Sequence, residues 1–261
     1  MAASPAPRLP DFVVGGAPRS GTTWLHSLLD RHPRVRMARP ARPEPKFFLV
    51  DEVYAKGLGH YAATWFRDVP DGSLAGEKSS NYLESAAAAE RIRECLPGAR
   101  MVFVLREPAE RAWSNWRWSR KNGMEDEEDF ARSLDLEARR ERECPAHLRF
   151  SRPHAYYSRG LYADLLGPWF ERFHRDRVLC LAFDDVVRTP RDVAARVHRF
   201  LGLEERPGDA DGLPAENAAG GEEGGPPIDD AMRRLREAYA GPNRRLAALL
   251  GPGFAPWEGM R

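Results

Sequence analysis

The chain has 261 residues, of which 42% are hydrophobic and 10% aromatic, enough to bury the core of one α/β domain. Its 40 basic and 39 acidic side chains leave a net charge of +1, which gives no electrostatic reason to expect nucleic acid or an anionic membrane as a partner. Three scattered cysteines favour reduced thiols, and no apolar stretch approaches the roughly 20 residues of a membrane helix. We therefore expect a cytoplasmic protein without a signal peptide, membrane insertion or nucleic acid partner.

The first predicted elements form a strand, a loop and a helix. Residues 1–10 are a proline-rich tail that we expect to be disordered. A buried strand is predicted at 11–15, and apolar residues at helical spacing predict a helix at 22–31. The segment 33–46 is rich in proline and arginine and is predicted as a loop, whereas an apolar stripe predicts a helix at 54–66.

The middle of the chain repeats this alternation. A short strand is predicted at 73–79, followed by an alanine-rich helix at 84–96 that Pro97-Gly98 ends. The run RMVFVL at 100–105 predicts a second buried strand. Pro108 then begins a helix that extends to about Arg120, because proline suits the first helical turn. The densely charged residues 125–143 are predicted as a solvated helix.

The last third completes the pattern. An amphipathic helix is predicted at 160–174, a buried strand at 177–183 and a further helix at 192–201. Residues 206–227 are rich in glycine, proline and acid, and we expect a flexible loop or a disordered segment there. A final helix is predicted at 229–250, with a possible break at Gly241-Pro242. Strands alternating with helices predict an α/β fold, a central parallel sheet with helices on both faces.

The loop GGAPRSGTTW lies between the first strand and the first helix. Its spacing is close to the phosphate-binding pattern G-x-x-x-x-G-K-[ST], with Gly16, Gly21 and Thr23 in place, but Thr22 stands where the lysine is expected and Arg19 lies inside the loop. The free N–H groups and the dipole at a helix N-terminus favour an anion. The loop therefore predicts a phosphate site; the alternative is an ordinary strand-to-helix turn with two glycines.

A second candidate anion site follows the strand at 100–105. Arg106 stands at the carboxyl end of that strand, and Ser114 lies two helical turns further on, so both can face one ligand. The alternatives are a surface salt bridge for Arg106 and an ordinary surface serine. Because ligands bind beyond the carboxyl ends of parallel strands, we expect the two anion sites to be neighbours.

Two acidic motifs complete the candidate site. Glu44 lies in the proline-stiffened segment PEPKFF, and Lys78 lies in the segment Glu77-Lys78-Ser79. A fixed carboxylate with a lysine nearby can take a proton from a hydroxyl or an amine. The alternative is a solvated surface loop anchored by Phe47-Phe48.

Together these motifs resemble the sulfotransferases that use 3′-phosphoadenosine 5′-phosphosulfate (PAPS). PRSGTTW resembles the 5′-phosphosulfate loop of that family, and LREPAERAWS resembles its 3′-phosphate site. EPKFF followed by EKSSNY, and later GLYADLLGPWFERF, RVLCLAFDDVVRTP and VHRFLGLE, are similar to the branch that sulfates heparan sulfate glucosamine at nitrogen or at the 3-hydroxyl. The resemblance covers roughly residues 11–203. Heavy use of alanine, arginine, glycine and proline favours a bacterial homologue of this branch.

The resemblance implies a P-loop-like three-layer sandwich, with one sulfotransferase domain over 11–261 and a flexible loop at about 206–227. It implies in-line transfer of the sulfuryl group with Glu44 as general base and with Arg19 and Lys78 as catalytic cations. Arg19 stands where the family commonly has lysine. The residues that it implies for PAPS binding are Arg19, Ser20, Gly21, Thr22, Thr23, Arg106, Ser114 and Tyr162. No metal is expected, because fixed cations and N–H groups can supply the electrostatics.

Two other functions stay open at this point. One is a P-loop nucleotide kinase or nucleoside triphosphatase, against which the absent lysine argues; the other is a catalytically inert nucleotide-binding homologue. The acceptor is a glycan or a small molecule sulfated at oxygen or nitrogen, and the oligomeric state is undetermined by the sequence.

Overall fold

A five-stranded sheet forms the centre of the chain over the residues that the computed structural model describes, which are 8–214, 226–251, 253–254 and 257. Its strands are β1 (Phe12–Gly16), β2 (Val35–Met37), β3 (Leu74–Lys78), β4 (Arg100–Leu105) and β5 (Val178–Ala182). Their order across the sheet is β2-β3-β1-β4-β5, and each neighbouring pair is parallel. The predicted α/β class is confirmed, with β1 between β3 and β4.

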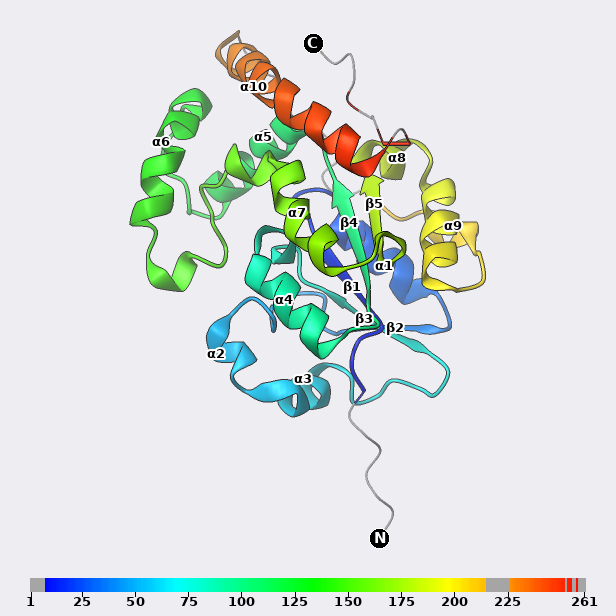
Figure 1. Ribbon diagram of the computed structural model, residues 1–261. Helices are drawn as coiled ribbons and strands as arrows, with labels where there is room; N and C mark the ends of the chain where they lie inside the picture. The colour runs from blue at the N-terminus through cyan, green and yellow to red at the C-terminus, as the bar shows by residue number, and fades with distance from the viewer. Residues whose placement is uncertain (1–7, 215–225, 252, 255–256, 258–261) are drawn as a thin grey trace.

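Helices cover both faces of this sheet, as Figure 1 shows. The helices of the described residues are α1 (Thr22–Arg31), α2 (Asp51–Tyr54), α3 (Gly57–Trp65), α4 (Ala86–Cys95), α5 (Pro108–Lys121), α6 (Phe130–Glu143), α7 (Tyr162–Arg172), α8 (Phe183–Arg188), α9 (Pro190–Leu201) and α10 (Pro226–Leu250). Successive residues of β1 face opposite ways: Val13 packs with α4 and α7, whereas Phe12 and Val14 pack with α1 and α9. The three-layer arrangement follows from this alternation.

A third apolar cluster joins α5, α6 and α10. It contains Ala112 of α5, Phe130 of α6 and Leu235 of α10, all buried. Figure 1 shows α5 and α10 beyond the arrowheads of β4 and β5, at the carboxyl edge of the sheet. This cluster therefore supports α5 at the edge where the sequence predicts the ligand.

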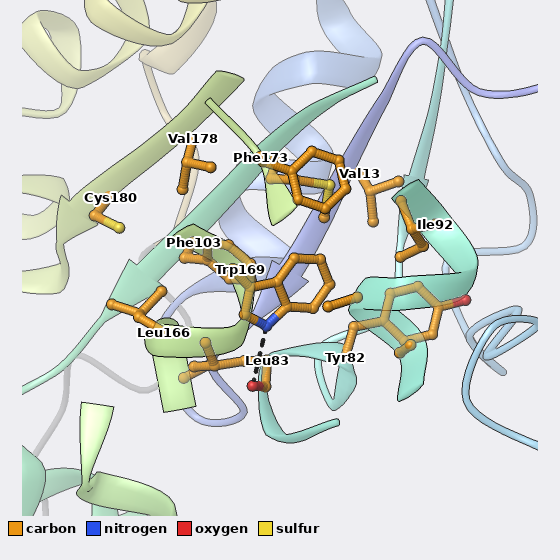
Figure 2. Packing of buried hydrophobic residues seen from close by; sticks show 14 of the residues in the cluster. Val13, Tyr82, Leu83, Ile92, Phe103, Leu166, Trp169, Phe173, Val178 and Cys180 are labelled. Carbon is orange, nitrogen blue, oxygen red and sulfur yellow. Dashed lines mark hydrogen bonds between the residues drawn. The ribbon is translucent and has the colours of Figure 1, made fainter. Parts of the chain in front are cut away.

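Trp169 of α7 lies at the centre of the core on one face (Figure 2). Its ring packs against Phe103 of β4 at a centroid distance of 5.0 Å. Its indole N–H donates to the carbonyl of Leu83 at 3.2 Å. This hydrogen bond ties α7 to the short turn η1 (Tyr82–Glu84), which directly follows the EKSSN segment.

Two predicted boundaries are wrong in the first third of the chain. Strand β2 lies inside 33–46, where the sequence predicts a loop; it has only three residues, with Val35 and Met37 buried against β3 and Arg36 exposed. The single helix predicted at 54–66 is two helices, α2 and α3, because Gly57 takes a left-handed φ of 81° between them.

The predicted loop at 206–227 lies partly outside the described residues, as does most of the predicted tail at 1–10. Within 206–214 the chain forms the turn η5 (Pro207–Ala210), where Arg31 donates to the carbonyls of Asp209 at 2.9 Å and Asp211 at 2.7 Å. Helix α10 continues through Pro242, so the possible break at Gly241-Pro242 does not occur.

Replacing Trp169 with phenylalanine tests how the core supports η1. Trp169→Phe keeps an aromatic ring but leaves the buried Leu83 carbonyl without its donor, so we expect the free energy of unfolding to fall by about 1–3 kcal/mol. Urea denaturation measures this loss. Trp65→Phe, at a half-buried site on α3, is the matched control and should change stability much less; equal losses would contradict this role of the indole N–H.

Candidate active site

The loop after β1 is shaped to hold an anion. Arg19 and Gly21 have left-handed φ angles of 66° and 87°, which curl the backbone so that successive N–H groups converge. Helix α1 then begins at Thr22 without a side-chain cap and without an acidic residue in its first turn. A side chain at Gly21 would meet the Phe183 ring at 2.8 Å, so glycine is required there on both steric and conformational grounds. The loop offers backbone donors and no competing negative charge.

Arg19 joins this loop to helix α5. Its Nε donates to the hydroxyl of Ser114 at 3.2 Å. Burial, followed by the charges of the neighbouring guanidinium groups of Arg106, Arg42 and Arg117, lowers the pKa of Arg19 to about 10. Arg19 still stays charged at neutral pH. The two predicted anion sites therefore lie side by side in a concentrated positive field.

Arg106 is held at the end of β4 by aromatic and acidic neighbours. It is buried, its guanidinium lies 5.2 Å from the Phe183 ring centroid, and it pairs with Glu110 at 3.5 Å. Burial lowers the pKa of Arg106. The hydroxyl of Tyr162 donates to the carbonyl of Arg106 at 2.9 Å, and burial raises the pKa of Tyr162 to about 12. Tyr162 thus supports the backbone of the second anion site from behind.

The remaining loop residues divide between buried and accessible positions. Ser20 is fully buried, and its hydroxyl donates to the carbonyl of Pro18 at 3.4 Å, while Thr22 is also buried at the start of α1. Thr23 is half-buried, and its hydroxyl accepts from Arg42 at 3.2 Å. The arginine-rich segment after β2 therefore reaches the loop after β1.

Glu44 lies at the carboxyl end of β3, not free in solvent. Lys78 Nζ contacts its carboxylate at 2.7 Å, in an ion pair whose side chains are 2% and 12% exposed for Lys78 and Glu44 respectively. Ser80 donates to the same carboxylate from its backbone N–H at 3.1 Å and from its hydroxyl at 3.0 Å. The predicted neighbourhood of Glu44 and Lys78 is present, and the carboxylate is held by three donors.

Sequence reasoning missed three contributors to the site. Ser80 follows the predicted strand, and its role depends on where the distant Glu44 loop lies. Arg42 was expected in a solvated loop or along the path of an acidic acceptor, and not beside the loop after β1. Arg117 lies three residues after Ser114 on α5, so helical spacing alone places both on one face and was the available signal.

Two further observations concern the described residues only. They contain no group of three or more His, Cys, Asp or Glu side chains placed to hold a metal ion. None of their helices combines the length and hydropathy that crossing a membrane requires.

Comparison with known proteins decides what kind of protein has this site. The family model described as "Sulfotransferase domain" matches residues 9–212, which include every candidate site residue. The chain belongs to the sulfotransferase family.

Several relatives of this sulfotransferase are known. It is 29% identical to human heparan sulfate glucosamine 3-O-sulfotransferase 6 over 268 residues, covering 95% of this chain and 73% of the relative. It is 26% identical over 202 residues to bifunctional heparan sulfate N-deacetylase/N-sulfotransferase 1 of Caenorhabditis briggsae, covering 76% of this chain but 23% of that protein. The chain thus spans about a quarter of the length of the bifunctional relatives.

Solved structures agree with the fold. A sulfotransferase from Alicyclobacillus acidocaldarius superposes with a TM-score of 0.77 and 26% identity, covering 96% of this chain and 99% of that one. The sulfotransferase domain from the curacin biosynthetic pathway, at 13% identity and a TM-score of 0.51, covers 93% of this chain and 98% of that domain, and shares the fold. The P-loop-like α/β architecture is therefore that of sulfotransferases.

The clustered arginines predict a measurable response to anions. Pyrophosphate relieves their mutual repulsion, so we expect it to raise the melting temperature more than sodium chloride of equal ionic strength does, by about 2–4 °C for each kcal/mol of binding free energy. Arg19→Met should raise the melting temperature in plain buffer, because it removes a repelled charge, and should weaken the pyrophosphate effect.

Scanning fluorimetry measures both effects. Arg93→Met, on the exposed side of α4, is the control and should keep the full response. An Arg19→Met protein that responds to pyrophosphate like wild type would contradict the assignment of the anion site.

Proposed function

We propose that this sulfotransferase transfers a sulfuryl group from PAPS to a hydroxyl or an amine of a carbohydrate or small-molecule acceptor. The observation that carries the proposal is the contact between Arg19 and Ser114, which joins two anion sites at the ends of the adjacent strands β1 and β4. PAPS has two anionic ends, a 5′-phosphosulfate and a 3′-phosphate. A protein with two neighbouring anion sites fits that donor better than it fits a simple nucleoside triphosphate.

The residues present fit the two ends of the donor. The curled loop at Arg19–Gly21 and the N-terminus of α1 would hold the 5′-phosphosulfate through backbone N–H groups and the hydroxyls of Thr22 and Thr23. Arg106 and Ser114 would hold the 3′-phosphate. Ser20 and Tyr162 are buried, so we assign them to positioning these groups.

The chain's own residues can then drive the transfer. PAPS, when bound, supplies an activated sulfuryl group. Glu44 would take the acceptor's proton, since Lys78 holds its carboxylate at 2.7 Å and 12% of its side chain remains exposed. Lys78 and Arg19 would stabilise the negative charge that develops on the transferring group. Arg19 would act as a fixed charge and not as a proton donor.

The relatives suggest the acceptor class. Two of them are named as enzymes of heparan sulfate, one acting on glucosamine as a 3-O-sulfotransferase. We therefore favour a carbohydrate acceptor, with oxygen or nitrogen as the sulfated atom. Absence of a metal requirement and a cytoplasmic location stay predictions from the sequence.

Binding of the product nucleotide tests the donor site. We expect 3′-phosphoadenosine 5′-phosphate (PAP) to bind without added metal and more tightly than ATP with magnesium. Arg106→Ala should weaken PAP binding by about 1.5–3 kcal/mol, the contribution of a charged hydrogen bond. Isothermal titration calorimetry measures both, with Arg93→Ala as the control. Preference for ATP with magnesium and indifference to the 3′-phosphate would instead support a nucleotide kinase.

Turnover tests the role of Glu44 and excludes an inert homologue. With radiolabelled PAPS and a panel of glucosamine, N-acetylglucosamine and a heparan sulfate oligosaccharide, we expect labelled acceptor from wild type. Glu44→Gln should lower kcat by about 10²–10⁴-fold, the usual contribution of a general base, with PAP affinity nearly unchanged. Glu52→Gln on α2 is the control. Full activity of Glu44→Gln would rule out this base.

A further inference from the structure

The end of β3 sends alternate side chains to two sets of partners. Lys78 and Ser80 contact the carboxylate of Glu44. Glu77 and Ser79 are fully buried, and the hydroxyl of Ser79 donates to Glu77 at 2.6 Å. This division follows from the two-residue period of a strand. One strand end therefore holds Glu44 and also carries a second carboxylate that solvent does not reach.

Glu77 is surrounded by hydroxyl groups and aromatic rings. It accepts hydrogen bonds from Tyr61 of α3 and from Ser79, and the hydroxyl of Tyr82 on η1 lies near enough to lower its pKa. Phe47 stacks on the ring of Tyr61 at a centroid distance of 4.3 Å, so a second aromatic ring packs beside this group of hydroxyls. Within the described residues the hydrogen bonds given for Glu77 come from hydroxyl groups. A carboxylate buried in this way needs these donors.

Two of the three hydroxyls also hold the loop that carries Glu44. The backbone N–H of Lys46 donates to Ser79 Oγ at 2.8 Å, and the backbone N–H of Phe48 donates to the hydroxyl of Tyr82 at 3.1 Å. Ser79 gives its one proton to Glu77 while accepting the Lys46 N–H, and Tyr82, near Glu77, accepts the Phe48 N–H and keeps its own proton to orient toward Glu77. This pattern of donors requires an acceptor-only group at position 77. A carboxylate meets the requirement and an amide does not.

We propose that Glu77 is a positioning residue, which through the hydroxyls of Ser79 and Tyr82 fixes the Glu44 loop (residues 43–48) against the end of β3. Pro45 leaves little freedom between Glu44 and the fixed N–H of Lys46, whose left-handed φ of 48° sets the turn. Fixing these two amides therefore fixes where the Glu44 carboxylate lies. The catalytic meaning of this role rests on the proposed function; the hydrogen-bond geometry does not.

Burying the charge of Glu77 costs free energy, and the three nearby hydroxyls offset part of that free energy. Burial raises the pKa of Glu77, while the hydrogen bonds from Ser79, Tyr61 and Tyr82 act in the opposite direction. A glutamine would avoid that cost in a purely structural core. Its NH₂ group, however, would face hydroxyls that have no other acceptor in this cluster.

Amide hydrogen exchange tests the geometry without any substrate. In Glu77→Gln we expect the amides of Lys46 and Phe48 to exchange at least about tenfold faster than in wild type, as for the loss of a hydrogen bond, while amides of α1 keep their rates. Ser79→Ala should accelerate mainly Lys46, and Tyr82→Phe mainly Phe48. NMR on labelled full-length protein resolves these signals. Unchanged rates at both amides in Glu77→Gln, or equal effects of the two single-hydroxyl variants on both, would overturn the proposal.

Turnover of radiolabelled PAPS, with the best acceptor of the panel, tests the positioning role. Glu77→Gln should lower kcat by about 10²-fold, as misplacement of a catalytic group does, with KM for the acceptor and the Kd of PAP within about twofold of wild type. In the background of Glu44→Gln, the same substitution should lower kcat little further, because both act through one carboxylate. Additive losses, or a loss confined to PAP affinity, would contradict positioning.

Controls separate the possible failures. Glu125 is another buried carboxylate that accepts a tyrosine hydroxyl, from Tyr156 at 2.7 Å, and Glu125→Gln should lower stability without the selective loss of kcat. If Glu77→Gln does not fold, Ser79→Ala and Tyr82→Phe carry the same test with the carboxylate in place. A wild-type protein that neither binds PAP nor turns over PAPS would refute the proposed function, and amide exchange would still decide the role of Glu77.

Discussion

Repulsion between arginines at the carboxyl edge of the sheet is the constraint on which the site depends. Burial is the largest cause of the lowered pKa of Arg19, and the charges of Arg106, Arg42 and Arg117 lower it further. Guanidinium groups stay charged in proteins, so an anionic ligand placed among them is attracted by all of them at once. A protein of modest stability keeps such a cluster where an anionic ligand compensates for it. The curled backbone of the loop after β1 adds N–H donors at the same place.

The order of the strands explains how residues far apart in sequence meet there. β3, β1 and β4 are neighbours, and all three end at one edge because the sheet is parallel. The glycine-containing loop follows β1, Arg106 follows β4, and Lys78 ends β3, while the Glu44 loop comes from beyond β2. The parallel sheet alone brings these ends together, so the loops do not need contacts of their own to place the residues near one another. The alternation along the end of β3 then places one acidic residue in the core and one cation beside Glu44.

Local patterns predicted much of this arrangement. The strand, glycine loop and helix at 11–31 and the strand at 100–105 were predicted because their apolar periodicity and turn residues are strong. β2 was missed because a three-residue edge strand in a proline-rich segment is too short to show a pattern. The spacing of apolar residues predicted one helix where Gly57 separates two. The two anion sites were expected to be neighbours because parallel strands end at one edge of the sheet, whereas the roles of Glu44 and Lys78 at one reacting centre came from the resemblance. Ser80, Arg42 and the role of Glu77 depend on contacts across the fold, which spacing does not contain.

A crystal structure of the protein with PAP would test the central claim most directly. We expect the 5′-phosphate within hydrogen-bond distance of the backbone N–H groups at Arg19–Thr23, and the 3′-phosphate between Arg106 and Ser114. We also expect Glu44 and Lys78 to border the space next to the 5′-phosphate, where the sulfuryl group and the acceptor would meet. A nucleotide bound away from the loop after β1, or with its 3′-phosphate in solvent, would contradict the assignment of both anion sites.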